Sequence, residues 1–213
     1  MTTPAIKICG ITTSQALEAA ISARADWIGL VFAKGSPRYA PMDVARELAK
    51  QAGKRIGKVG LFVDAEDRAI LQAVEAASLD VLQLHGNETP ERLAQIKARF
   101  GLPLWKAIPV ARAEDIDRAD AYREIADLIL FDAKTPPGSL PGGSGLVFDW
   151  SLLADHHRGY LWGLAGGLSP RNVAEALDLT GAHLVDTSSG VERGPGVKDS
   201  DKIAAFCQAA RQQ

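Results

Sequence analysis

The chain has 213 residues and a formal net charge of −2, and 46% of its residues are hydrophobic, which is typical of a globular protein with a sizeable core. Basic and acidic residues are interspersed, so no nucleic-acid partner is indicated. No apolar run approaches the roughly 18 residues of a membrane span, and the N-terminus lacks the apolar core of a signal peptide, so we expect a cytoplasmic protein with no membrane partner.

Eight short apolar segments recur along the chain, and most are followed by a polar or glycine-containing loop and a helical pattern. The predicted strands are residues 5–9, 26–32, 58–63, 81–85, 104–108, 128–132, 160–165 and 183–186. Helical patterns are clear at residues 14–22, 43–52, 68–77 and 91–100. This alternation is typical of a parallel sheet with right-handed crossovers, which closes into a barrel at about 200 residues or more. We therefore predict an α/β protein, a (β/α)8 TIM barrel whose single domain spans residues 1–213 and has one function.

An open, doubly wound sheet also fits the alternation of strands and helices. It would place a phosphate loop directly after the first strand, whereas the glycine-rich loops of this chain come late. Thr89-Pro90 and Ser169-Pro170 each put a capping hydroxyl before a proline, which predicts two helix starts. Residues 133–148 are rich in proline and glycine and follow the sixth strand, so we expect a long loop of the kind that often forms a lid.

The C-terminal ends of barrel strands carry the functional residues of this fold. The residues there are Cys9, Phe32, His85, Asp132, Gly166, Gly167, Asp186, Ser188 and Ser189. Because alternate residues of a strand share a face, Lys7 lies on the face of Cys9, and Gln83 lies on the face of His85. If these faces point into the barrel, polar groups line its mouth.

Residues 165–172 and 186–199 form the loops after the seventh and eighth strands, which is the usual phosphate position in such barrels. Paired glycines alone more often mark turns, but this placement favours an anion site formed by backbone N–H groups. A helix expected to start near Pro170 would add its positive dipole end. We assign phosphate binding to Gly166, Gly167, Ser188, Ser189 and Gly190.

Cys9 ends the first strand directly before Gly10. A lone cysteine is more often a small core hydrophobe, but the strand end favours a functional thiol. We expect Lys7 to stabilise the thiolate and to lower the pKa of Cys9 from about 8.5 toward neutral pH. The thiolate would then be a base or a nucleophile.

Asp132 ends an apolar strand, where an unpaired carboxylate would cost free energy. It either pairs with Lys134 or Lys106, or burial and the like charge of Asp186 raise its pKa so that it acts as an acid. Since the first and sixth strands lie on opposite sides of the ring, a substrate would fit between Asp132 and Cys9.

Other candidate residues have competing interpretations. Arg38 is either a solvated loop residue or a fork for a substrate carboxylate, and His85 is as readily a hydrogen-bonding or capping residue as a proton donor. His156 and His157 are adjacent, with no carboxylate at helical spacing, so they predict no metal site. The glycine stretch at residues 141–145 lacks the ending of a P-loop.

The two cysteines lie at opposite ends of the chain and form no CxxC pair. Neither a disulfide framework nor a zinc site is therefore predicted. Cys207 falls within a helical pattern, where we expect a buried thiol.

A set of motifs runs along essentially the whole chain: KICGIT, SPRY, QLHG, DAKTP with GGSG and FDW, GGLSPRNV, and DTSSGVE with PGVKD. No single motif is unique, but in this order the sequence resembles the phosphoribosylanthranilate isomerases of tryptophan biosynthesis. The resemblance implies a (β/α)8 barrel that converts N-(5'-phosphoribosyl)anthranilate into 1-(2-carboxyphenylamino)-1-deoxyribulose 5-phosphate by an Amadori rearrangement, without cofactor or metal. The chain departs from the family pattern at Ala165, where many members have serine, and at Thr187, where valine is common.

The resemblance also implies residue roles. Cys9 would be the general base, Asp132 the general acid, and Arg38 would face the anthranilate carboxylate. We assign the remaining contacts with the substrate to Lys7, Gln83, His85 and Asp186. The expected partner is a small phosphosugar, and the chain is expected to be a monomer or a homodimer.

Two other functions fit parts of the pattern. The histidine-pathway isomerase performs the same rearrangement and is similar at the phosphate loops, but it uses an aspartate at the end of the first strand, where this chain has Cys9. It also has a two-half repeat, and here no second glycine pair follows the third strand. A silent barrel that only binds a phosphorylated metabolite would not need both Cys9 and Asp132.

Overall fold

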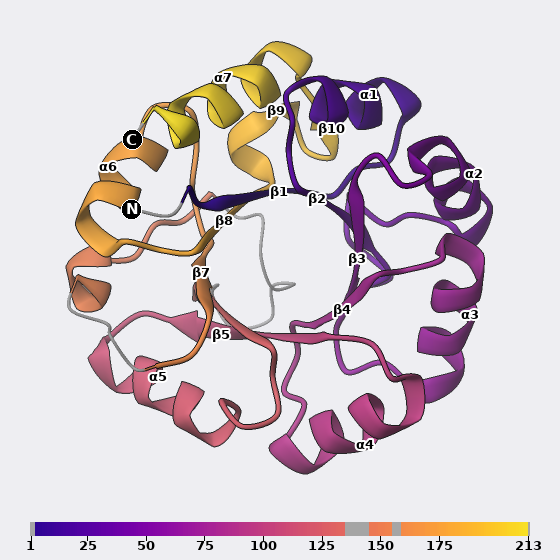
Figure 1. Ribbon diagram of the computed structural model, residues 1–213, viewed down its shortest axis with the longest axis horizontal. Helices are drawn as coiled ribbons and strands as arrows, with labels where there is room; N and C mark the ends of the chain where they lie inside the picture. Colours follow the sequence, from indigo (N-terminus) through magenta and orange to yellow (C-terminus); the bar gives the residue numbers. More distant parts are fainter. Residues whose placement is uncertain (1–2, 135–144, 155–158, 213) are drawn as a thin grey trace.

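The computed structural model describes residues 3–134, 145–154 and 159–212. Eight parallel strands close into a barrel in chain order, so that the last lies beside the first (Figure 1). The strands are β1 Ala5–Cys9, β2 Trp27–Val31, β3 Gly57–Phe62, β4 Val81–Leu84, β5 Leu104–Val110, β6 Leu128–Ala133, β7 Trp162–Leu164 and β8 Leu184–Thr187. The predicted (β/α)8 barrel is confirmed.

A ring of helices surrounds the barrel (Figure 1). The α-helices are α1 Ser14–Ser22, α2 Met42–Ala52, α3 Asp67–Ala77, α4 Pro90–Phe100, α5 Ala113–Asp117, α6 Val173–Thr180 and α7 Ser200–Arg211. Short 3-10 helices are η1 Arg118–Ala121, η2 Trp150–Leu153 and η3 Ser189–Val191, and a two-stranded hairpin is formed by β9 Glu192–Gly194 and β10 Val197–Lys198. Most of the predicted lid, at residues 135–144, lies outside the described residues, as do His156 and His157.

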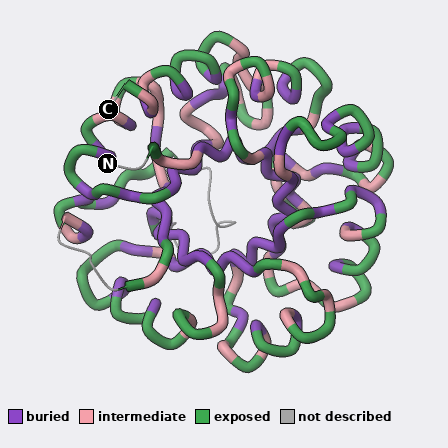
Figure 2. Tube along the Cα trace, in the orientation of Figure 1, coloured by how far each residue is buried: buried purple, intermediate pink, exposed green. Residues whose placement is uncertain are grey.

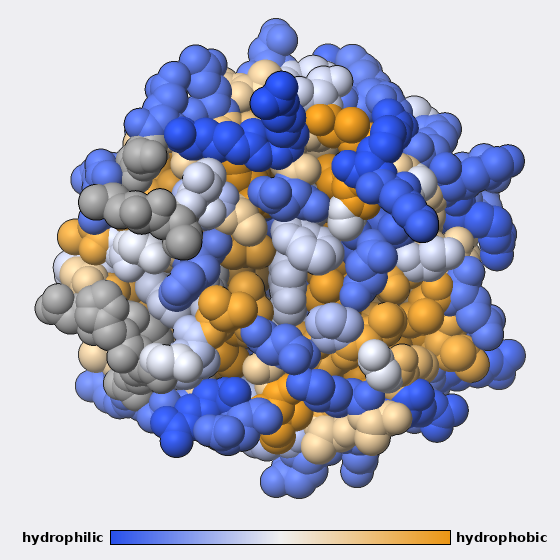
Figure 3. Space-filling model, viewed as in Figure 1, coloured by the Kyte–Doolittle hydropathy of each residue, from blue (hydrophilic) through white to orange (hydrophobic). Residues whose placement is uncertain are grey.

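The burial of residues differs between the inner layer of strands and the outer layer of helices. The strands are buried along nearly their whole length, while each helix alternates between buried and exposed residues (Figure 2). In α2, for example, Ala45, Leu48 and Ala52 face the barrel, at the helical spacing of three and four. Burying a leucine of this kind contributes about 1.5–3 kcal/mol relative to leaving it exposed. Hydrophilic side chains occupy much of the outer rim (Figure 3).

The two proline-marked helix starts have different outcomes. Thr89 caps α4 as predicted, because its hydroxyl accepts a hydrogen bond from the Arg92 backbone N–H and Pro90 is the first helical residue. Ser169 does not cap α6, so that prediction was wrong. Residues 170–172 form a turn, and the helix begins at Val173, although the Val173 N–H already bonds the Ser169 carbonyl.

The barrel closes between β1 and β8, where Lys7 and Asp186 are register partners. The hairpin β9–β10 follows β8 and lies against the loop after β2. A Cβ on Gly196 would lie 2.3 Å from the Pro37 carbonyl oxygen, so the two backbones touch there. No helix among the described residues is long and apolar enough to cross a bilayer.

Candidate active site

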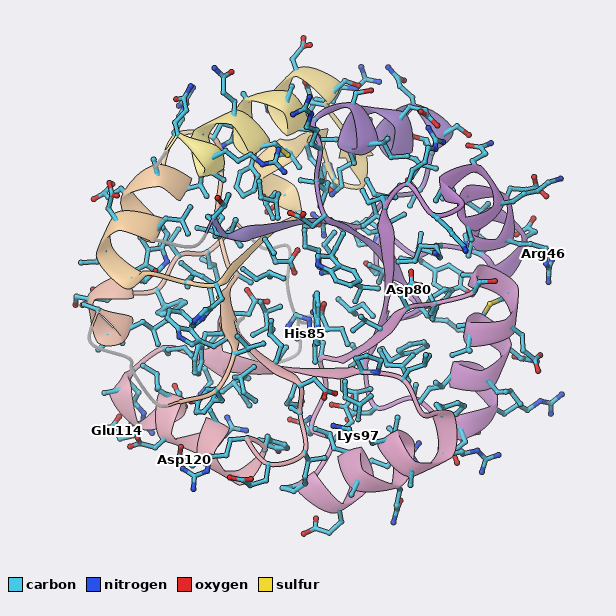
Figure 4. The ribbon with its side chains drawn as sticks, viewed as in Figure 1. Arg46, Asp80, His85, Lys97, Glu114 and Asp120 are labelled. Carbon is cyan, nitrogen blue, oxygen red and sulfur yellow. The ribbon has the colours of Figure 1, made fainter. Side chains whose placement is uncertain are left out.

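A cavity of about 730 Å³, including its open mouth, lies at the C-terminal ends of the strands. His85 lies within the ring of strands, whereas Arg46, Glu114 and Asp120 lie at the outer rim (Figure 4). Nine of the predicted site residues line this cavity: Cys9, Arg38, His85, Asp132, Gly166, Gly167, Asp186, Ser188 and Ser189. Phe32, also at a strand end, instead stacks on Phe62.

The environment of Cys9 differs from the prediction. Burial raises the pKa of the Cys9 thiol, and the opposing effect of the Lys7 ammonium does not overcome it. Lys7 Nζ lies 2.7 Å from Asp186 Oδ2, so its charge is already paired with a carboxylate. The predicted lowering of the Cys9 pKa was therefore wrong, because desolvation outweighs a cation whose charge is shared.

Lys7 forms an ion pair with Asp186, which lines the cavity, and Lys7 itself is fully buried. Burial alone would lower the pKa of Lys7, but Asp186 and Cys9 raise it above the usual value. Burial raises the pKa of Asp186 despite Lys7. Gln83 is also fully buried, and neither atom of its side-chain amide has a hydrogen-bond partner among the described residues. Neither Lys7 nor Gln83 lines the cavity itself.

Asp132 pairs with His85, whose Nε2 lies 3.0 Å from Asp132 Oδ2. Its other oxygen accepts a hydrogen bond of 2.8 Å from the Ala133 backbone N–H. The predicted lysine partners belong elsewhere, since Lys106 pairs with Glu88 and Lys134 lies near Asp115. An imidazole nitrogen either donates or accepts a hydrogen bond. His85 Nε2 and Asp132 Oδ2 can therefore share one proton across this contact.

Arg38 is buried, so its interpretation as a solvated loop residue was wrong. Its Nε and Nη2 each donate a 2.8 Å hydrogen bond to one oxygen of Glu192. This fork-to-fork geometry fixes the plane of the guanidinium at the wall of the cavity.

The two predicted phosphate loops are joined directly. Thr187 Oγ1 donates a 2.7 Å hydrogen bond to the Leu168 carbonyl, and a Cβ on Gly190 would lie 1.9 Å from the same oxygen. Gly190 does not line the cavity but packs closely against the other loop, and its role in phosphate binding stays a prediction. The Ser188 hydroxyl donates to the Cys9 carbonyl. In this structure that hydroxyl proton is therefore used within the protein.

An apolar wall on the side of β2 and β3 was not anticipated from the sequence. It consists of Val31, Ala33, Leu61 and Val63. Polar residues at the strand ends were the main candidates, and these four residues are apolar. Their signal was available, because Val31 is the last residue of β2 and Leu61 is the last but one of β3, much as Cys9 is the last residue of β1.

Glu192 and Lys198 were also missed. Glu192 and Lys198 lie in the short hairpin β9–β10, whose sequence has no strand or helix periodicity, so nothing local distinguished them from surface charges. No group of three or more histidine, cysteine, aspartate or glutamate residues within the described part of the chain is arranged to hold a metal ion.

Comparison with known proteins points to one enzyme family. The family described as N-(5'-phosphoribosyl)anthranilate (PRA) isomerase matches residues 6–209. An N-(5'-phosphoribosyl)anthranilate isomerase from Parvibaculum lavamentivorans is 52% identical over 209 residues, covering 97% of each chain. The counterpart from Paramagnetospirillum magneticum is 52% identical over 207 residues, covering 97% of this chain and 96% of its own.

Solved structures agree. The phosphoribosyl anthranilate isomerase of Thermotoga maritima is 36% identical, with a TM-score of 0.89 and coverage of 99% of this chain and 100% of its own. A phosphoribosyl anthranilate isomerase in complex with reduced 1-(o-carboxyphenylamino)-1-deoxyribulose 5-phosphate is 34% identical, with a TM-score of 0.86 and the same coverage.

Proposed function

The chain belongs to the N-(5'-phosphoribosyl)anthranilate isomerase family and so isomerises this substrate in tryptophan biosynthesis, and we propose that Cys9 and Asp132 are its general base and general acid. The proposal rests on one observation above all: Cys9 on β1 and Asp132 on β6 line the same cavity. Groups on opposite sides of a ribose can act on two of its bonds.

The residues that line the cavity support one orientation of the substrate. Its phosphate lies at the loops after β7 and β8, where Gly166, Gly167, Ser188 and Ser189 line the cavity. Its aromatic ring lies against the apolar wall of β2 and β3. The ring carboxylate then faces Arg38, which is a suitable bidentate partner for it. The ribose is left between Cys9 and Asp132.

Ring opening is the first step. The protonated Asp132 donates its proton to the furanose oxygen while the bond from that oxygen to C1' breaks, and the anilino nitrogen supplies the electron pair that forms the iminium. His85 holds Asp132 by the 3.0 Å contact and so aims the donated proton. Asp132 is left as a carboxylate.

Proton abstraction is the second step. The iminium makes the C2' hydrogen acidic, and the Cys9 thiolate removes it, which gives an enolamine and a neutral thiol. Tautomerisation then moves a proton onto C1' and removes one from the 2'-hydroxyl, which yields the ketone. These transfers can return the proton of Cys9 to substrate and a proton to Asp132, so atoms and charge balance over one cycle. Lys7 stabilises the thiolate while it exists.

Turnover of freshly prepared phosphoribosylanthranilate, followed as the loss of its fluorescence, tests these roles. General acid and general base catalysis each contribute about 10²- to 10⁴-fold, so Cys9→Ala and Asp132→Asn should each lower kcat by at least about 10²-fold. Near-normal turnover by either variant would refute the role of that residue. Tight phosphosugar binding by the wild-type chain without turnover would instead favour a silent barrel.

We also propose that the chain has this single activity, acts in the cytoplasm, and is a monomer or homodimer. The Thermotoga maritima relative is described as dimeric, and monomers have been generated from it, which supports either state. Sedimentation equilibrium of the purified chain distinguishes the two.

A further inference from the structure

Glu192, the first residue of the hairpin β9–β10, contacts Arg38 without itself lining the cavity. Its carboxylate accepts both of the 2.8 Å hydrogen bonds from Arg38, and only 7% of Glu192 is exposed. Two parallel bonds to a planar guanidinium fix its rotation as well as its position. The orientation of Arg38 is therefore set by a residue 154 positions away in the sequence.

Lys198, on the other strand of the hairpin, extends this contact to the phosphate end of the cavity. Its Nζ donates to Glu192 Oε1 at 2.7 Å, to the Ser188 carbonyl at 3.0 Å and to the Ser188 hydroxyl at 3.1 Å. The Lys198 side chain is 1% exposed. A continuous series of charged hydrogen bonds thus runs from Arg38 through Glu192 and Lys198 to Ser188.

The hairpin that carries this series is itself held in place. The Gly196 backbone N–H donates to Glu192 Oε2 at 3.2 Å, and Lys202 of α7 donates to the Glu192 carbonyl at 2.7 Å. Backbone contact between Gly196 and Pro37 places the hairpin against the Arg38 loop. Glu192 is consequently held by the turn of its own hairpin and by α7, and the hairpin packs against the loop that carries Arg38.

The charges of the series suit an anionic ligand. Burial alone would raise the pKa of Glu192, but Arg38 and Lys198 outweigh it and lower the pKa, so the carboxylate stays ionised. Within the series, Arg38 and Lys198 carry positive charge and Glu192 carries negative charge. A substrate carboxylate at Arg38 would add a second negative charge beside these two cations.

We propose that Glu192 is a positioning residue that holds Arg38 in the plane needed to bind the ring carboxylate, and that Lys198 couples this end of the site to Ser188 at the phosphate end. The inference rests on the proposed placement of the ring carboxylate at Arg38. It assigns substrate discrimination to a hairpin outside the cavity.

A pair of ligands that differ only in the carboxylate tests the proposal. The first is reduced 1-(o-carboxyphenylamino)-1-deoxyribulose 5-phosphate, and the second is its phenylamino counterpart without the carboxylate. Hydrogen bonds to charged groups contribute about 1.5–3 kcal/mol, which is roughly 10- to 100-fold in affinity. By calorimetry, Glu192→Gln should weaken the first ligand by at least about 10-fold and the second by less than about 2-fold. It should also raise KM for phosphoribosylanthranilate more than it lowers kcat.

Controls separate positioning from folding. Glu18→Gln removes a similar forked pair, to Arg55, on the outer surface, and should change neither affinity. Equal weakening of both ligands by Glu192→Gln would overturn the inference, because it would reveal only a structural role. Tighter binding of the first ligand would also overturn it, because Glu192 would then be a competitor of the substrate.

A second variant separates this inference from the function on which it rests. Arg38→Met should discriminate between the two ligands at least as strongly as Glu192→Gln. If Arg38→Met weakens both equally, the placement of the carboxylate fails and the inference fails with it. If Arg38→Met discriminates and Glu192→Gln does not, only the role of Glu192 is wrong.

Discussion

Cys9 is a proposed base in surroundings that disfavour its charged form. Burial raises the pKa of the thiol, and Lys7, the nearest cation on its own strand, is paired with Asp186. A folded pKa above the ordinary value means that the thiolate fraction at neutral pH is smaller than that of a free cysteine. Activity that depends on the thiolate should therefore rise with pH.

We expect the rate of Cys9 alkylation by iodoacetamide to increase with pH to beyond pH 9, in parallel with kcat/KM on the alkaline side. The measurement uses a Cys207→Ala background, because Cys207 is the other thiol and its pKa is raised by burial to about 11. A plateau below about pH 8 would show that the thiolate is stabilised in the folded protein.

Single residues were predictable where strand geometry governs them. Cys9 and Asp132 were located from the rule that barrel strands end at the functional face. The contacts of Arg38 and Lys7 were not predictable, because their partners, Glu192 and Asp186, are far away in the sequence and only barrel closure brings them near. The direction of the Cys9 pKa shift was not predictable either, because it depends on burial and on the distant partner of Lys7.

At the scale of elements, a buried ion pair connects adjacent βα units. Lys106 of β5 donates to Glu88 at 2.9 Å and to the carbonyl of Gly86 at 2.7 Å, and the Glu88 carboxylate accepts from the Asp64 backbone N–H. The loops after β3 and β4 are thereby attached to β5. Burial lowers the pKa of Lys106, which Glu88 only partly opposes.

Lys106→Met should lower the free energy of unfolding by about 3–5 kcal/mol, because Glu88 would stay buried without its cation. Urea denaturation measures the change. Adding Glu88→Gln to that variant should recover part of the loss, and Arg112→Met, at an exposed pair, should change stability little. A loss as small as that of Arg112→Met would mean that the buried pair does not stabilise these loops.

A second prediction concerns the two phosphate loops. Gly190→Ala would place a methyl group against the Leu168 carbonyl and push the loops apart, so KM should rise by about 10-fold or more, as expected when ligand contacts worth 1.4 kcal/mol are lost. Gly194→Ala is the matched control, because a Cβ there has no neighbour within 4 Å. Equal KM values for both variants would contradict the proposed role of these loops.

Element type was predictable for the eight barrel strands and for α1 to α4, because short apolar runs alternate with helical patterns, but the hairpin β9–β10 had no such signal. Element ends were less so. Ser169-Pro170 has the same local signal as Thr89-Pro90, yet Asn172 Oδ1 accepts hydrogen bonds from the Ser169 N–H and hydroxyl, and the chain makes a turn before α6 begins. The Ser-Pro capping pattern alone does not reveal that a neighbouring side chain competes for the hydrogen bonds of Ser169.

At the scale of the whole molecule, closure of the barrel depends on the β1–β8 contact, where Lys7 and Asp186 face each other. A buried pair contributes little net free energy compared with an apolar pair, but removing one partner leaves the other without compensation. The two residues therefore constrain each other.

Lys7→Met should destabilise the fold by about 3–5 kcal/mol at neutral pH, and adding Asp186→Asn should recover part of this. Burial already raises the pKa of Asp186, and loss of Lys7 raises it further. A carboxyl whose folded pKa lies above its unfolded pKa favours folding at low pH and loses this effect as pH rises through the folded pKa. The difference from wild type in urea unfolding should therefore shrink as the pH falls; a constant difference would contradict it.

The contact between the first and last strands also decides when a newly made chain can begin to work. Cys9 is translated before strands β2 to β7, whereas Asp186 and Ser188 follow all of them. A polypeptide stalled before β8 would carry the thiol of its proposed base in an unfinished pocket that lacks Ser188 and Ser189. Catalysis thus depends on translation having passed β8 and the loop that follows it.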